Sequence, residues 1–121
     1  MTPADADVLA QAGAADAGRI LIRGDLGRVC VAVVDTNGDG AFLAAVSLHL
    51  DDDGAWRESE WNSAAVLGQG WVHGVAYCYG RAPAGTEVEI APHGRVQEMQ
   101  VNEAGWWLYM AGTEEPPPLE P

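Results

Sequence analysis

The stretch RVCVAVVDTNGDGAFLAAVSLHL, residues 28–50, decides the fold, because two apolar, partly β-branched runs flank one loop rich in glycine and aspartate. The Asn-Gly pair at 37–38 is a strong hairpin signal, since the tight turns between antiparallel strands need residues that tolerate a positive φ. The Asp-Gly pair at 39–40 lengthens the loop. This segment therefore predicts a hairpin between residues 28–35 and residues 41–50.

The same pattern continues on both sides of this hairpin. Short apolar or alternating runs are separated by turn residues about every 8 to 12 positions, which is typical of antiparallel sandwiches and barrels. The sequence therefore predicts an all-β fold, an antiparallel β-sandwich or small barrel of about seven to eight short strands, preceded by one short N-terminal helix. The further strands are expected in RILIR (19–23), AWRESEW (55–61), WVHGVAYCYG (71–80), TEVEIA (86–91), RVQEMQVN (95–102) and WWLYMAG (106–112).

Three of these runs carry finer predictions. AWRESEW has Trp56 and Trp61 on opposite parity, and its charges are typical of an edge strand. WVHGVAYCYG is interpreted as one central strand. In RVQEMQVN the apolar parity slips after Val96, so we expect a β-bulge near Gln97 or Glu98.

The chain divides into three segments. Residues 1–18 form an N-terminal helical segment, in which Thr2 is expected as the N-cap and Pro3 as the first helical residue. Residues 19–112 form the β-sandwich domain. Residues 113–121, TEEPPPLEP, are expected to be a flexible acidic tail, because three consecutive prolines cannot continue a sheet.

The net charge of the chain indicates which classes of binding partner to expect. Eighteen acidic residues stand against six basic residues, which gives a formal charge of −12, and all six basic residues are Arg. Such a surface repels phosphate backbones and anionic membranes, so we expect no nucleic-acid or membrane partner. A basic protein or a cation would be attracted. The use of Arg without Lys, with abundant Ala and Gly, is similar to high-GC bacterial coding.

The N-terminus and the cysteines suggest a compartment. MTPADADVLA has neither a basic start nor a long apolar run, so a cytoplasmic location is expected. Cys30 and Cys78 both fall in apolar strand-like runs, and in a reducing compartment we expect two buried thiols.

The loop of the predicted hairpin also carries a metal-binding motif. Asp35, Asn37 and Asp39, followed by glycine, have the spacing D-x-N-x-D-G, which resembles the calcium loops of EF-hands and dockerins over six residues. The twelfth position, where those loops place a bidentate Glu, is Val46. A hairpin without a physiological metal is therefore favoured, and Ca²⁺ held by the three side chains is the alternative.

Signals for catalysis are weak. His49, His73 and His93 have no spacing typical of a metal site, and no serine lies in a G-x-S-x-G motif. No catalytic residue is predicted. Tryptophan is the more informative residue type, because Trp is favoured as an anchor in binding surfaces, and we select the candidate binding residues Trp56, Trp61 and Trp107.

These observations favour a non-enzymatic acidic β-sandwich that binds another protein, with a basic partner in an immunity-like or inhibitor-like role. The alternative is a ligand-binding module for calcium or carbohydrate. A third hypothesis is an enzyme whose site is assembled in a barrel cavity.

Overall fold

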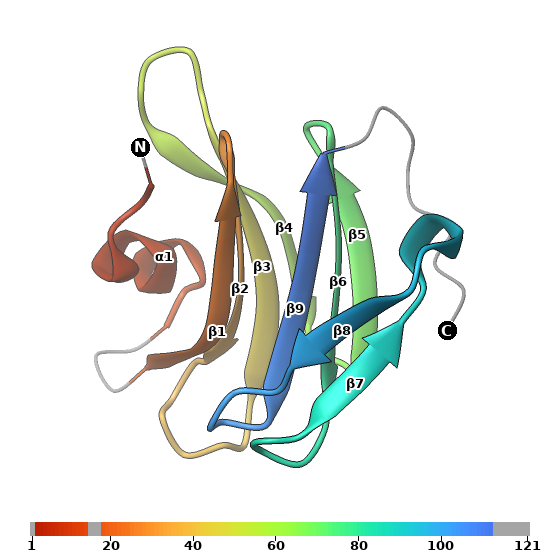
Figure 1. The fold of residues 1–121 in the computed structure, drawn as a ribbon. Coiled ribbons are helices and arrows are strands. Elements are labelled where there is room, and N and C mark those ends of the chain that lie inside the picture. The colour runs from red at the N-terminus through yellow and green to blue at the C-terminus, as the bar shows by residue number, and fades with distance from the viewer. Residues whose placement is uncertain (1, 15–17, 113–121) are drawn as a thin grey trace.

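The computed structural model describes residues 2–14 and 18–112, and the predicted tail 113–121 lies outside these ranges. The described residues form a sandwich-like all-β fold with nine antiparallel strands in three sheets, which confirms the predicted fold class. Two sheets face each other, α1 lies outside one of them, and a hairpin lies outside the other (Figure 1). The elements are α1 (Asp5–Gln11), β1 (Arg19–Leu26), β2 (Val29–Asp35), β3 (Leu43–Leu50), β4 (Trp56–Ser63), β5 (Leu67–Val72), β6 (Val75–Arg81), β7 (Glu87–Ile90), the 3₁₀ turn η1 (Pro92–Gly94), β8 (Gln97–Gln100) and β9 (Trp106–Gly112).

The first sheet, sheet A, has the strand order β1-β2-β3-β4 and is built from consecutive hairpins. The predicted hairpin of β2 and β3 is confirmed, with Asp35 opposite Leu43 and Val29 opposite His49. Every residue of β2 is buried, because one of its faces packs on the second sheet and the other packs under α1. Val8 of α1 is fully buried in that outer cluster, which stabilises the fold by about 1.5–3 kcal/mol.

The second sheet, sheet B, has the order β5-β6-β9 and closes the main core. Tyr77 and Tyr79 of β6 point toward sheet A and lie across Gly70 and Gly68 of the neighbouring strand β5. Their rings occupy the volume that side chains on β5 would fill. Trp106 of β9 completes this core and is almost fully buried.

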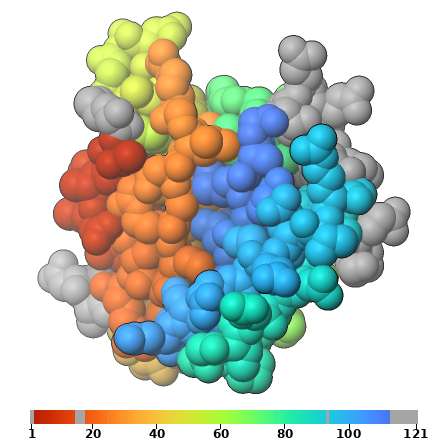
Figure 2. All heavy atoms as spheres, viewed as in Figure 1, coloured from red at the N-terminus to blue at the C-terminus, as the bar shows by residue number. Residues whose placement is uncertain are grey.

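The two sheets approach each other along the β1 and β9 side of the sandwich. Gly24 of β1 lies directly against the side chains of Leu108 and Met110 of β9, so any Cβ at this position would collide with them. In the space-filling view, β1 and β9 meet on the face shown (Figure 2). The opposite side, between the edge strands β4 and β5, is where a second pocket described below opens.

WVHGVAYCYG is not one central strand, and that prediction is wrong. The segment is the hairpin of β5 and β6, with Val72 opposite Val75 and a two-residue turn at His73 and Gly74. Both turn residues have positive φ, 44° and 80°, as a type I′ turn requires. The usual first residues of such a turn are Asn, Asp and Gly, so the His-Gly pair did not stand out as a turn signal.

Three smaller predictions also need correction. Helix α1 begins at Asp5 after the N-cap Ala4, whose side chain makes no capping hydrogen bond, so Thr2 is not the N-cap and Pro3 is not the first helical residue. The hairpin of β7 and β8 has an unbroken register, and Val96 lies before β8 rather than in a bulge. Strand β1 runs past the predicted residues 19–23 to Leu26, so the turn to β2 is at Gly27 and Arg28.

AWRESEW is an edge strand, as predicted, because β4 pairs only with β3 in sheet A. A register shift between Ser47 and Leu48, however, leaves Ser59 as an extra residue of β4. Trp56 and Trp61 therefore lie opposite Leu50 and Val46 and face the same side, toward α1. The parity argument that placed these two side chains on opposite faces is wrong, because it assumed a regular strand.

Two further observations concern the surroundings of the protein. Cys30 and Cys78 are free and buried, as expected. Among the described residues, no helix has the length and the apolar character that a membrane span requires.

Candidate functional site

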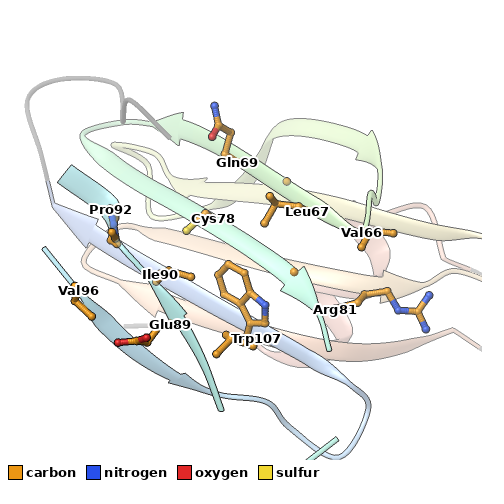
Figure 3. Close-up of a pocket in the computed structure, with 14 residues that line it drawn as sticks. Val66, Leu67, Gln69, Cys78, Arg81, Glu89, Ile90, Pro92, Val96 and Trp107 are labelled. Carbon is orange, nitrogen blue, oxygen red and sulfur yellow. The ribbon is translucent and has the colours of Figure 1, made fainter. Parts of the chain in front are cut away.

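A groove of about 770 Å³ lies on the outer face of sheet B, beside the hairpin of β7 and β8 (Figure 3). Its floor is formed by side chains of sheet B that point away from the core, among them Leu67, Cys78 and Trp107. Its wall is the segment from Val88 to Pro92, and Val96 stands at its rim. A volume of this size lies within the range of about 300–1,000 Å³ that is usual for ligand pockets.

The groove exists because sheet C, which consists of β7 and β8, covers only part of the outer face of sheet B. Val88 and Ile90 pack toward Trp107 in a small third cluster. Glu87 and Glu89 alternate with them and are exposed, as the alternation in TEVEIA predicts. No residue of β8 lines the groove, so its wall is β7 and the turn that follows.

Apolar side chains at this groove are unusually exposed. Among the described residues, the three most exposed large apolar side chains are Val66 at 72%, Val96 at 65% and Leu67 at 52%. All three line the groove. Isolated exposed apolar residues are ordinary, but a cluster of them around one concavity is typical of a binding site.

The polar groups of the groove are few. Arg81 stands at one end of it, with its guanidinium carbon 5.1 Å from the ring centroid of Trp106. Glu89 lies on the wall. Burial raises the pKa of the Cys78 thiol on the floor to about 11, so this thiol is protonated at neutral pH and acts as an apolar surface rather than as a nucleophile.

A second, more polar pocket of about 560 Å³ opens on the other side of the sandwich, where β4 and β5 are the edge strands. His49 of β3 and His73 of the β5–β6 turn stack across it with ring centroids 4.1 Å apart. The Nδ1 atom of His49 lies 2.5 Å from the Oγ atom of Ser59 and shares a hydrogen bond with it. Glu58, Glu60 and Trp71 complete the lining with Val72.

Burial and the neighbouring His73 lower the pKa of His49 below its ordinary value. Asp51 acts in the opposite direction, but more weakly than these two. His49 is therefore neutral at physiological pH, which fits a ring stacked on a second imidazole. The pocket offers imidazole, hydroxyl and carboxylate groups for hydrogen bonds to a polar ligand.

The His49–Ser59 pair resembles a general base next to a nucleophile, but among the described residues no third group orients the base. Within the described residues, no hydrogen bond orients the other nitrogen of His49, and no group of three His, Cys, Asp or Glu side chains has the geometry of a metal site. The sequence placed both histidines on strands. The fold brings them together because His73 lies in a turn.

Asp35, Asn37 and Asp39 lie at the loop between β2 and β3, and the first of them is turned inward. Asp35 is 0% exposed, and its two carboxylate oxygens accept hydrogen bonds from the amides of Gly38 and Gly40 at 2.9 and 2.8 Å. Asp39 is exposed and accepts a hydrogen bond from the amide of Ala41. The first carboxylate thus holds the loop closed, which is a structural role that the sequence motif does not reveal.

The three tryptophans proposed as binding residues occupy different environments. Trp107 is only 5% exposed, and its ring lies on the floor of the groove (Figure 3). Trp61 is 39% exposed, donates its indole hydrogen to the carbonyl of Ala12 and stacks near Phe42. Trp56 is partly buried against α1. The fold therefore brings Trp107 to the groove and places the other two on the far side of sheet A.

The residues around the groove come from four separate parts of the sequence: 66–69, 78–81, 88–96 and 107. Only Val96 gave a local signal, because its parity did not fit the strand that follows it. Comparison of the chain with protein-family models, with curated proteins and with solved structures found no match in any of the three.

Proposed function

We propose that this protein is a non-enzymatic binding protein that takes an apolar segment of another protein into the groove on sheet B. The observation that carries this proposal is the position of Val66, Leu67 and Val96, the three most exposed large apolar side chains among the described residues, around one groove. Apolar groups stay exposed at a cost in solubility, and a partner that covers them gains about 25 cal/mol per Å² of buried apolar surface.

The charge of the chain adds a second requirement for the partner. With a formal charge of −12, the surface attracts basic proteins and repels acidic ones. Long-range attraction mainly raises the association rate, whereas contacts in the groove determine how long the complex lasts. An inhibitor-like or immunity-like role against a basic protein fits both properties.

The test uses two substitutions that add the same charge at different places. Peptides are selected on the full chain from a random display library, and their binding is then measured to the Val66→Asp variant and to the Leu26→Asp variant. Leu26 is an exposed apolar residue at the end of β1 that does not line the groove. We expect Val66→Asp to weaken the selected peptides at least about tenfold and Leu26→Asp to have little effect.

The opposite pattern, or equal effects of both substitutions, would contradict binding in the groove. The added negative charge is useful here because it increases the attraction of basic peptides to both variants. A loss of binding in the Val66→Asp variant alone must therefore come from lost apolar contact.

A second candidate function rests on the polar pocket beside β4 and β5. Its aromatic ring, two imidazoles, hydroxyl and carboxylates form the combination that proteins use for carbohydrates, in which a ring stacks on the sugar face and polar groups bind the hydroxyls. Titration of the protein with neutral oligosaccharides, followed by Trp fluorescence, tests it. A Trp71→Ala variant that binds them as the natural chain does would rule this site out.

A further inference from the structure

Within the described part of the chain, the hairpin that forms the wall of the groove has a free backbone edge. β7 pairs only with β8 there, and outside that ladder the backbone of Glu87 and Glu89 makes no hydrogen bond to a described residue. The groove lies on this side of the hairpin, since β7 lines it and β8 does not. An unpaired strand edge beside an apolar groove is the arrangement to which an extended peptide adds as a further strand.

The register shows which groups point toward the groove. Val101 donates its amide hydrogen to the carbonyl of Thr86 at 2.9 Å, and the hydrogen-bonded pairs of an antiparallel ladder alternate. Val88 and Ile90 therefore use their backbone groups within the hairpin. Glu87 and Glu89 direct their N–H and C=O groups to the free edge.

On the outward face of the same hairpin, carboxylates of like charge lie next to one another. Glu89 lies directly opposite Glu98, both are exposed, and Glu87 is their neighbour on β7. Like charges directly opposite each other destabilise a pair of strands. No arginine forms an ion pair with these three carboxylates among the described residues. Basic side chains on an added strand would relieve this repulsion.

Resting on the proposed function, we infer that the partner binds as an extended strand added to the free edge of β7, with apolar side chains in the groove and basic side chains beside Glu87 and Glu89. The residues of the added strand that lie opposite these two glutamates exchange backbone hydrogen bonds with them, and their side chains point outward. The alternate residues point inward, over Leu67 and Trp107.

Such a strand also completes the packing of the molecule. A two-stranded hairpin is marginally stable by itself, and sheet C covers only part of the outer face of sheet B. A third strand would extend sheet C over Leu67 and Val66, which are now exposed. The recognition sequence is therefore a short segment in which basic and apolar residues alternate.

The probe is a capped seven-residue peptide of alternating Lys and Val, measured against the full chain by calorimetry and by amide chemical shifts. One variant peptide carries N-methyl groups on the Lys residues, whose N–H groups would pair with Glu87 and Glu89, and a control carries them on the Val residues. We expect the first modification to weaken binding about tenfold or more, because at least two hydrogen bonds are lost, and the second to have little effect.

Two variants of the protein test the same edge from the other side. Glu89→Pro removes the edge N–H but leaves the ladder to β8 intact, because this N–H points away from β8. Glu89→Gln keeps the N–H and removes only the charge. We expect Glu89→Pro to weaken the peptide clearly more than Glu89→Gln, while neither variant melts at a lower temperature than the natural chain, because both lose the repulsion between Glu89 and Glu98.

The outcomes separate the two proposals. If the peptide binds and Val66→Asp weakens it, but neither Lys N-methylation nor Glu89→Pro does, the groove takes side chains alone and strand addition is wrong. If no peptide binds at all, the proposed function itself fails. If the natural chain forms a concentration-dependent dimer that Glu89→Pro abolishes, the edge pairs with a second copy, and the inference of a basic partner is overturned.

Discussion

Replacement of Gly68 or Gly70 should disturb the core directly. They lie on the inner face of β5, and a Cβ at either position would come within 2.3 Å of the ring of Tyr79 or Tyr77. Small side chains on one strand thus make room for large aromatic ones on the next, so this pair of strands is packed as a unit.

We therefore expect Gly70→Ala to lower the free energy of unfolding by about 1–3 kcal/mol, because the Tyr77 ring must leave its position. Urea denaturation measures the difference. Gly112→Ala is the matched control, since Gly112 also belongs to a strand of sheet B, where it is the last residue of β9, and a Cβ there meets nothing within 4 Å. Equal effects of the two substitutions would show that the close ring contact is not what requires glycine.

The partly buried position of His49 beside His73 predicts a dependence of stability on pH. Its pKa in the folded protein is lowered from the ordinary 6.5, so the unfolded chain binds a proton more readily than the folded chain does. The free energy of unfolding should therefore fall as the pH drops through about 6.5, and the fall should end below the folded pKa of His49.

His49→Gln should make the stability flatter between about pH 7 and pH 5, because it removes this titrating group. Urea denaturation at several pH values gives the slope for each protein. His93→Gln is the control, because His93 lies in the 3₁₀ turn η1 on the far side of sheet B from this pocket. A slope that is unchanged in His49→Gln would refute this explanation.

At the level of elements, the hairpin of β7 and β8 should be the easiest to stabilise. Replacing Glu98 by Lys converts the facing pair with Glu89 from like charges to opposite charges, which should stabilise the protein by about 0.2–1 kcal/mol. Glu87→Lys adds the same charge opposite Gln100 and should stabilise it less. A thermal melt of both variants at low salt compares them, and an equal gain would mean that net charge, not the facing pair, is responsible.

The calcium motif lies in the loop between β2 and β3, and its hydrogen bonds predict how the protein responds to Ca²⁺. Because both carboxylate oxygens of Asp35 already accept hydrogen bonds from Gly38 and Gly40, we expect millimolar Ca²⁺ to leave the melting temperature unchanged. Asp35→Ala should instead cost about 2–3 kcal/mol or more, since two amides lose their acceptor. A clear rise of the melting temperature with Ca²⁺, absent in Asp39→Ala, would support the metal site instead.

The elements also show where the sequence could predict the fold and where it could not. The hairpin of β2 and β3 followed from its β-branched runs and its Asn-Gly pair, both of which are local signals. The hairpin in WVHGVAYCYG was missed because its turn uses His73 at positive φ, which is rare enough to give no signal. The bulge at Ser59 was missed because it depends on pairing with β3, a tertiary property.

The groove could not be predicted from the sequence, because it too is a tertiary property. It depends on how sheet C lies across sheet B, and nothing in the chain specifies that angle locally. Trp107 was selected as a binding residue because tryptophan is favoured as an anchor in binding surfaces. The structure places its neighbour Trp106 in the core and Trp107 under the groove, because consecutive residues of a strand face opposite sides.

For the whole molecule, the charge and the groove make separable contributions to binding. The formal charge of −12 acts over distances set by the ionic strength, with a screening length of about 10 Å at 0.1 M salt. The groove acts only on contact. For a basic partner segment, raising the salt concentration should therefore lower the association rate and leave the dissociation rate nearly constant.

The alternating Lys and Val peptide, measured by stopped-flow fluorescence between about 0.02 and 0.5 M NaCl, gives both rates over a wide change in screening length. The Val66→Asp variant should show the complementary pattern, a faster dissociation with an association rate as high as that of the natural chain, because it loses apolar contact and gains negative charge. If salt changed mainly the dissociation rate of the natural chain, the charges would act within the bound complex. The acidic surface would then be part of the contact itself, rather than a field that guides a basic partner to the groove.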